Sequence, residues 1–201
     1  MKDREYWHER CWQRKSWKYG ELLLIWQLTA VDNGLWQLFL PGRGPRELPA
    51  ENRFQPGTCA DELRQKAVAV NELLNQKPVP VPPAPWKDIF CGRQRFTPFE
   101  AVVLDCLSRV PAGMVVSYGS LARRAGHPRA ARAVGSLMAK NPFPLFYPCH
   151  RVVKADGRLG NFGGGTELKQ RLLEDEGVVF RKPQHVDSSS RFEAEVNLPR
   201  P

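Results

Sequence analysis

The sequence predicts an α+β protein built from a small N-terminal α/β domain and an α-rich C-terminal domain. Two apolar runs that contain tryptophan are followed by a segment with helical periodicity, which favours a hairpin covered by one or two helices. A proline-rich stretch at 78–86 then interrupts regular structure. The remainder alternates short helical segments with Gly- and Pro-containing turns, a pattern typical of helix-turn-helix domains. We therefore expect domains at 1–91 and 92–180, with a flexible polar tail at 181–201.

The N-terminal half begins with a predicted β-hairpin. Apolar runs at 22–31 and 35–40 flank the turn signal Asn33-Gly34. Asn-Gly favours a type I′ turn, which joins two antiparallel strands tightly. Residues 61–76 place apolar side chains at helical spacing and predict an amphipathic helix. The Pro-rich stretch that follows is a stiff, extended spacer, which we take as the connection between the domains.

Helix start and stop signals divide the second half into four helices. Thr97 and Glu100 have the spacing of a capping box, and Ser117 is placed to cap a second helix that Gly126 ends. The third helix is rich in alanine and glycine; small side chains allow close approach to DNA, but they also suit tight packing on another helix. The expected helices cover 97–109, 117–124, 129–140 and 167–175.

Positive charge is concentrated in the second half of the chain. The formal net charge is +9, the pI is near 9.6, and no Asp or Glu occurs from Cys106 to Ala155. Such a basic stretch predicts a polyanionic partner, most simply nucleic acid. No apolar run is long enough for a membrane span, and the N-terminus lacks the apolar segment of a signal or transit peptide. We expect a cytoplasmic protein, or a nuclear one in a eukaryote, with no membrane partner.

Five cysteines occur, at positions 11, 59, 91, 106 and 149. An odd number without paired spacing argues against a disulfide framework and for a reducing compartment. A zinc site is conceivable near the N-terminus, but no Cys-x-x-Cys pair supports it, so we predict no metal. Its ligands would be His8, Cys11, Cys59 and Cys91. Cys106 lies on an apolar helical stripe and is expected in the core.

The most informative motif is the run Pro-Cys-His-Arg-Val-Val at 148–153. A free thiol is a weak nucleophile at neutral pH, and a neighbouring base or positive charge activates it. His150 follows Cys149 directly, but adjacent side chains often point apart, so a bridging water would carry the proton between them. Arg151 supplies positive charge, and Glu176 is a candidate acid to orient the imidazole. The alternative is a buried structural cysteine beside a loop histidine; the acid-free surroundings and a nearby glycine-rich loop favour a reactive cysteine.

Several motifs taken together resemble the O6-alkylguanine-DNA alkyltransferases, also called methylated-DNA–protein-cysteine methyltransferases. The resemblance covers residues 92–177 in matching order and spacing, and its most specific part is the Pro-Cys-His-Arg-Val motif. The other parts are Ser117-Tyr118, Ala130-Ala-Arg-Ala-Val-Gly135, Asn141-Pro142 and Gly160-Asn161. Residues 1–91 share only an outline with the family. The resemblance implies a ribonuclease-H-like N-terminal domain and a winged-helix-like C-terminal domain.

The resemblance implies direct, irreversible repair of O6-alkylguanine in double-stranded DNA, with O4-alkylthymine as a candidate second substrate. The damaged base would be flipped out of the duplex. Cys149 would attack the alkyl carbon in line and keep the alkyl group, so each molecule would act once. His150, paired with Glu176, would be the base that generates the thiolate, and Tyr118 would donate a proton or hydrogen bond to the guanine ring. No metal or organic cofactor would take part.

The resemblance also implies how substrate and DNA are bound. Arg132 would fill the gap left in the base stack, and Asn141 would brace the active-site turn. The pocket around the flipped guanine would be formed by Val152, Gly163, Met138 and Phe162. The third helix would lie in the minor groove, which predicts nearly sequence-independent, salt-sensitive binding by a monomer. Position 162 is often Tyr in the family and position 163 often Ser in vertebrate members, so the preference for bulky adducts is open.

Three other functions fit parts of the pattern. A non-catalytic protein that binds alkylated DNA would lack the reactive cysteine, whereas Cys149 is present. A regulator that senses alkylation through an N-terminal metal domain would need four clustered cysteines upstream, where only three occur. A cysteine hydrolase would leave the acid-free basic stretch without a purpose. Alkyl transfer from DNA is therefore the preferred interpretation.

Overall fold

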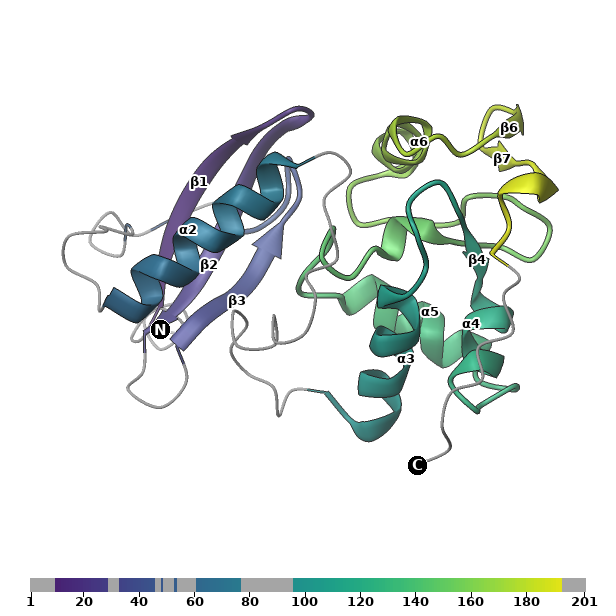
Figure 1. Cartoon of the computed structure of the whole chain (residues 1–201), viewed down its shortest axis with the longest axis horizontal. Helices are drawn as coiled ribbons and strands as arrows, with labels where there is room; N and C mark the ends of the chain where they lie inside the picture. Colours follow the sequence, from purple (N-terminus) through teal and green to yellow (C-terminus); the bar gives the residue numbers. More distant parts are fainter. Residues whose placement is uncertain are drawn as a thin grey trace. The chain divides into compact units, whose positions relative to one another are not determined.

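The chain divides into two compact units, Met1–Arg95 and Phe96–Pro201 (Figure 1). The computed structural model describes residues 10–28, 33–45, 48, 53, 61–76 and 96–192. The predicted domain boundary at 91/92 and the Pro-rich stretch lie outside these described residues. Within them, no helix is long and apolar enough to cross a membrane.

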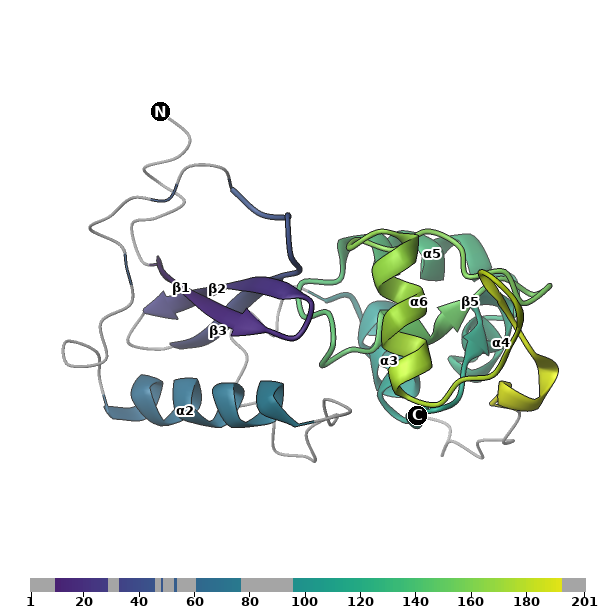
Figure 2. The same ribbon diagram turned by 90° about the horizontal axis from the view of Figure 1, so that it is seen from above.

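The first unit contains a three-stranded antiparallel sheet of order β1-β2-β3 with a helix along it (Figure 2). Its elements are β1 (Arg10–Trp17), β2 (Gly20–Leu28), β3 (Asn33–Phe39) and α2 (Asp61–Asn75). All four consecutive residues 22–25 of β2 are buried, so both faces of this central strand are covered. Ala67, Val70 and Leu74 of α2 are buried too, which confirms the predicted amphipathic helix.

The predicted hairpin is confirmed, but its turn lies elsewhere. β2 and β3 pair antiparallel, and Asn33 and Gly34 are themselves strand residues opposite Leu28 and Gln27. The connection therefore falls on 29–32, outside the described residues. The sequence does not predict β1, because an edge strand rich in Arg, Lys and Gln lacks the apolar alternation of a half-buried strand.

The second unit is α-rich and contains two apolar core clusters, the larger of which includes Cys149. Its main elements are α3 (Pro98–Ser108), β4 (Val116–Ser117), α4 (Tyr118–Arg124), α5 (Ala131–Lys140), the 3₁₀ turn η4 (Cys149–Arg151), β5 (Val152–Val153) and α6 (Thr166–Asp175). β4 and β5 pair in parallel, with Ser117 opposite Val153. This pairing brings the start of α4 next to the segment that follows Cys149. Helices and strands in both units confirm the α+β class.

The helix ends follow the predicted signals closely. The capping box between Thr97 and Glu100 is present at the start of α3, and the Ser117 side chain accepts from the Ser120 N–H at the start of α4. Gly126 has φ 78° and ends α4 in a Schellman motif, in which His127 N–H donates to Ala122 O over 2.9 Å. α5 begins at Ala131, two residues after the predicted start, because residues 127–130 form a separate turn in which the Ala130 N–H donates to His127 O over 2.9 Å.

The prediction of a flexible tail from residue 181 is wrong for residues 181–192. These residues form the hairpin β6 (Phe180–Lys182) and β7 (His185–Val186) and the turn η5 (Ser188–Ser190). Backbone hydrogen bonds of 2.8 Å join Val115 N to Ser190 O and Phe192 N to Val115 O. A polar composition concealed this segment, although its few apolar side chains, Phe180, Val186 and Phe192, pack against the two core clusters. Residues 193–201 lie outside the described part.

Candidate active site

Cys149 lies at the start of η4, a turn that the preceding proline shapes. Pro148 has φ −75° and ψ 65°, the conformation of an inverse γ-turn, and the Cys149 N–H donates to Tyr147 O over 2.7 Å. The Arg151 N–H then donates to Pro148 O over 2.8 Å. Cys149 itself is only 6% exposed. Main-chain hydrogen bonds therefore hold the thiol in one place inside the domain.

Asn141 joins the end of α5 to this turn. Its Nδ2 donates to Tyr147 O over 2.8 Å, and its Oδ1 accepts from the Phe143 N–H over 3.0 Å. The same carbonyl of Tyr147 also accepts from the Cys149 N–H. Asn141 thus connects the end of α5 directly to the backbone of the cysteine turn, which is the position that a bracing residue requires.

The surroundings of Cys149 favour the thiol over the thiolate. Burial raises the pKa of Cys149 above its usual value. Four groups act in the opposite direction: a hydrogen bond from the Asn141 side chain, the charge of Lys169, and the N–H groups of Cys149 and His150. Because burial prevails, the thiol needs a base to remove its proton before it can react.

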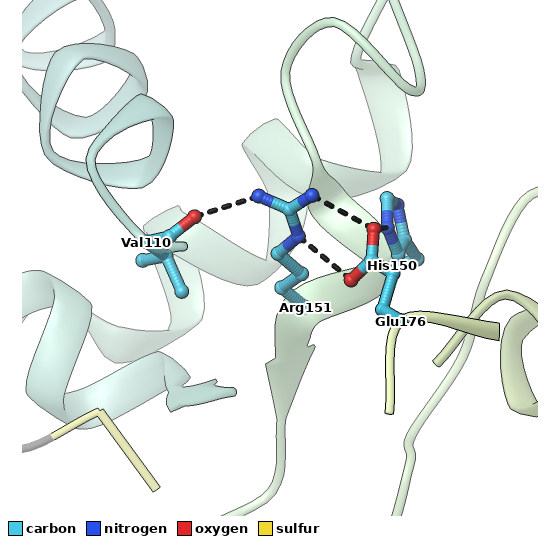
Figure 3. A network of polar contacts seen from close by, with 4 residues as sticks. All are labelled: Val110, His150, Arg151 and Glu176. Atoms are coloured by element: carbon cyan, nitrogen blue, oxygen red, sulfur yellow. Dashed lines mark hydrogen bonds and ion pairs between the residues drawn. The ribbon is translucent and has the colours of Figure 1, made fainter. Parts of the chain in front are cut away.

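His150 and Glu176 form a buried pair beside the cysteine. Nε2 of His150 lies 3.0 Å from Oε1 of Glu176, and the two side chains are 2% and 7% exposed. Arg151 completes this network from the other side (Figure 3): its Nη2 and Nε donate to the two oxygens of Glu176 over 2.7 and 2.9 Å. Glu176 can reach both because it caps the C-terminus of α6, where Gly177 with φ 84° turns the chain.

The charges of this network determine which atoms of His150 carry protons. Burial raises the pKa of Glu176, but the hydrogen bonds and charges of His150 and Arg151 outweigh it and hold the pKa at about 2. An ionised carboxylate only accepts hydrogen bonds, so His150 Nε2 must be the donor. Burial lowers the pKa of His150, so the ring is neutral and Nδ1 has a free lone pair. Nδ1 is buried without a hydrogen-bond partner among the described residues, and it is therefore available as a base.

Tyr118 is the first residue of α4 and lies close to Cys149. Gly160 makes room for its hydroxyl, since a β-carbon there would lie only 3.3 Å from that oxygen; a β-carbon on Gly135 would lie in ordinary contact with the ring, at 4.0 Å. Burial raises the pKa of Tyr118, and the charge of a Cys149 thiolate raises it further. The phenol is therefore protonated at neutral pH and can act as a donor.

The remaining predicted residues separate into two groups. Met138, Phe162 and Tyr118 are half-buried against the core cluster that contains Cys149 and Val152. The Phe162 ring also meets the His150 ring edge-on, with centroids 6.4 Å apart. Arg132 and Gly163, by contrast, are exposed. A β-carbon on Gly163 would meet nothing within 4 Å, so this position of the loop is open.

The small residues of α5 are divided between two faces, since Gly135 lies against the Tyr118 ring whereas others face solvent. Ala133, Ser136 and Ala139 are exposed together with Arg132, while Val134 and Leu137 point into the core. Tight packing on another helix therefore explains Gly135, which lies against Tyr118 of α4, but not the exposed small residues. The exposed face is instead free for close approach by a partner.

Comparison with known proteins agrees with this geometry. A family model for the DNA-binding domain of 6-O-methylguanine DNA methyltransferase matches residues 98–178. Methylated-DNA–protein-cysteine methyltransferase of Homo sapiens is 36% identical over 168 residues, which cover 78% of this chain and 77% of the human protein. The chain belongs to this methyltransferase family. The Cricetulus griseus protein of the same name is 40% identical over 168 residues, covering 78% of this chain and 79% of its own.

Solved structures extend the likeness to most of the chain. Mycobacterium tuberculosis OGT in complex with DNA superposes with a TM-score of 0.58 at 29% identity, over 83% of this chain and 92% of that protein. The resemblance that the Pro-Cys-His-Arg-Val motif indicated is therefore confirmed at the level of the methyltransferase family.

Two buried cations of this methyltransferase site are not among the predicted site residues. Arg151 was expected to contribute free positive charge, but it is 3% exposed and its charge is neutralised by Glu176. Lys169 is fully buried, and its Nζ donates to Val152 O and Leu159 O over 2.6 Å each. Burial lowers the pKa of Lys169 to about 8, against an opposing effect of the Cys149 charge. The sequence does carry a signal for the burial of Lys169: Lys169 and Glu176 lie seven residues apart, on the same helical stripe as the buried Leu172 and Leu173.

The described residues offer no metal site. No group of three or more His, Cys, Asp or Glu side chains comes together in the described ranges. The conceivable zinc ligands His8, Cys59 and Cys91 lie outside those ranges, and the side chain of Cys11 is not described.

Proposed function

We propose that this chain repairs O6-alkylguanine in duplex DNA by transferring the alkyl group irreversibly to Cys149. The observation that carries the proposal is the arrangement around the thiol: a buried cysteine that needs a base, beside a neutral imidazole whose Nδ1 is free to accept a proton. Membership of the methyltransferase family supplies the substrate class. O4-alkylthymine is a second candidate substrate.

The transfer begins with the removal of one proton from the thiol. A water between Cys149 and His150 passes the thiol proton to Nδ1, and Glu176 stabilises the imidazolium that forms. The Cys149 sulfur then attacks the alkyl carbon in line, the bond between that carbon and O6 breaks, and its electron pair stays on guanine. Tyr118 donates its proton or a hydrogen bond to the guanine ring, which makes guanine a better leaving group. Because no step removes the alkyl group from sulfur, each molecule acts once.

The pocket binds the damaged base, and the exposed face of α5 binds the DNA duplex. A flipped guanine enters the pocket, where the main chain of Val152 and the amide of Gly163 contact its polar edges, and Met138 and Phe162 line its sides. The exposed face of α5 lies in the minor groove, where small side chains permit a close approach. Arg132 fills the gap in the base stack. We expect monomeric binding that is nearly independent of sequence and weakened by salt.

Two further expectations go with this assignment. The first unit is a ribonuclease-H-like domain, in keeping with its antiparallel sheet and helix, and the second is winged-helix-like, in keeping with the α4–α5 pair. The protein works in the cytoplasm, or in the nucleus of a eukaryote.

A label-transfer assay tests the proposed function. The protein is incubated with a duplex that carries one radiolabelled O6-methylguanine, next to a Cys149→Ala variant and a Cys106→Ala control. Cys106 is a buried free cysteine of the same unit and suits this control. We expect one label per protein molecule for the wild type and for Cys106→Ala, and none for Cys149→Ala. Tight binding of the lesion without transfer by the wild type would instead identify a non-catalytic lesion-binding protein.

A further inference from the structure

Arg151 is buried at the centre of the network in Figure 3, where it joins three separate segments. Its Nη1 donates to Val110 O over 2.7 Å, just after α3, while Nε and Nη2 hold both oxygens of Glu176 at the end of α6. The residue itself belongs to η4, two positions after Cys149. At 3% exposure it is not placed to contact DNA, and its guanidinium donates to Val110 and Glu176 rather than to Cys149. Any influence on the reaction must act through Glu176 and His150.

The charges of the network cancel only because Arg151 is present. Arg151 contributes one positive charge and Glu176 one negative charge, so neutral His150 completes a buried group with no net charge. Glu176 faces His150 and Arg151, and His150 faces Glu176, Arg151 and Lys169. Lys169 is held by two backbone carbonyls and makes no ion pair with Glu176. Arg151 is therefore the cation that balances the carboxylate.

Without Arg151, the pair of Glu176 and His150 would carry an uncompensated negative charge in a buried site. Such a charge is costly, so the pair would bind a proton. The imidazole is the stronger base of the two, because the ordinary pKa of histidine lies about two units above that of glutamate. The proton would therefore go to His150, which would become a cation with hydrogen on both nitrogens. It would occupy Nδ1, the atom that must accept a proton from the thiol.

We propose that Arg151 is a positioning residue that keeps Nδ1 of His150 free of a proton, by supplying the positive charge that a bound proton would otherwise supply. The inference rests on the proposed function, because it assigns the role of base to Nδ1. It explains why a fully enclosed arginine follows the reactive cysteine and its base. It also explains the two-point contact, which holds both carboxylate oxygens close to the positive charge.

The test follows the protons on His150 directly. The full chain is labelled with ¹⁵N-histidine, and the protonation of Nδ1 and Nε2 is measured by NMR from pH 5 to 9. His150 is assigned by substitution of the other three histidines, His8, His127 and His185. The variants are Arg151→Met, which removes the charge, and Arg151→Lys, which retains it. Arg158→Met serves as the control, because Arg158 is an exposed ion-paired arginine of the same unit.

We expect the wild type to have hydrogen on Nε2 and a bare Nδ1 at neutral pH. In Arg151→Met the midpoint for protonation of Nδ1 should rise by about 1–3 pH units, the range over which one neighbouring charge shifts a titration. Arg151→Lys and Arg158→Met should stay within about half a unit of the wild type. If Arg151→Met does not fold, Arg151→Gln removes the charge but keeps an amide donor, and the same rise is expected.

The rate at which iodoacetamide alkylates Cys149, followed by mass spectrometry, provides a second reading that does not need DNA. In Arg151→Met the fall of this rate at low pH should begin at a higher pH, in step with the higher midpoint of Nδ1, so that raising the pH restores the rate. A purely structural defect would instead lower the rate equally at every pH. A bare Nδ1 in Arg151→Met at the wild-type midpoint would overturn the proposal. The proposal would also be overturned if the midpoint of Nδ1 rose as much in Arg151→Lys as in Arg151→Met, since the shape of the side chain rather than its charge would then matter. Neither reading depends on alkyl transfer from DNA, so failure of the proposed function would appear separately, in the label-transfer assay.

Discussion

Replacing Glu176 by glutamine keeps the shape of the side chain but removes the charge that Arg151 and His150 surround. The folded pKa of Glu176 is about 2, against an ordinary value of 4.5. A difference of this size corresponds to about 3 kcal/mol of stability at neutral pH. The variant also leaves Arg151 as a buried cation without its partner, a defect that costs roughly 3–5 kcal/mol in other proteins. We therefore expect Glu176→Gln to lower the free energy of unfolding of the second unit by about 3 kcal/mol at pH 7.

The loss should depend on pH in a defined direction. Because folding lowers the pKa of Glu176, its ionised form stabilises the protein fully above pH 4.5, and the stabilisation disappears as pH falls from 4.5 toward 2. The difference between wild type and Glu176→Gln should shrink over the same window. Glu174→Gln is the matched control, since Glu174 is an exposed residue of the same helix, and it should change stability by less than about 0.5 kcal/mol.

Hydrogen exchange detected by mass spectrometry is the suitable assay, because it reports each unit separately. All six tryptophans lie in residues 1–95, so their fluorescence follows the first unit only. Peptides from α3 and α6 should exchange about 100-fold faster in Glu176→Gln at pH 7, while tryptophan fluorescence should show no change in the first unit. A loss below about 1 kcal/mol, or one of equal size at pH 7 and pH 2, would refute the assignment of Glu176 as an ionised buried partner.

Three other substitutions test separate parts of the site. Tyr118→Phe should slow methyl transfer about 100-fold or more in single-turnover assays and leave lesion binding nearly unchanged, since it removes a proton donor and no contact area; an unchanged rate would exclude Tyr118 as the donor. Asn141→Ala should destabilise the cysteine turn by about 1–3 kcal/mol, because two hydrogen bonds are lost, and hydrogen exchange of peptides spanning the turn would detect this. Lys169→Met should raise the pKa of Cys149 further and slow its alkylation by iodoacetamide at pH 7; equal or faster alkylation would contradict an effect of its charge on the thiol.

Local sequence signals predicted much of the second unit. The capping box at Thr97, the cap at Ser117 and the stop at Gly126 each depend on a few consecutive residues, and all three are present in the structure. The signals were weaker for strands that pair with distant residues and for strands made of polar residues. The parallel β4–β5 pair joins residues 36 positions apart, and two-residue strands carry no periodicity of their own. Strand β1 and the β6–β7 hairpin are rich in charged residues and resemble loops in sequence.

The candidate site was likewise predicted from the sequence only in part. The motif and the family resemblance identified Cys149, His150 and Glu176, and the structure brings the last two into contact. The surroundings of the two buried cations were not predictable, because a sequence shows an arginine or lysine without showing whether it is enclosed. Arg151 meets Val110 across 41 positions and Glu176 across 25, and only the packing of three elements reveals that its charge is neutralised inside the domain.

The most direct test of the account is to locate and count the transferred methyl group. The protein is mixed with a threefold excess of duplex that contains one O6-methylguanine, digested, and its peptides are measured by mass spectrometry over time. We predict one methyl group per protein molecule, on the peptide that contains Cys149, with an equal amount of guanine restored and no further repair. Repeated turnover, or a methyl group on another residue, would contradict irreversible transfer to Cys149.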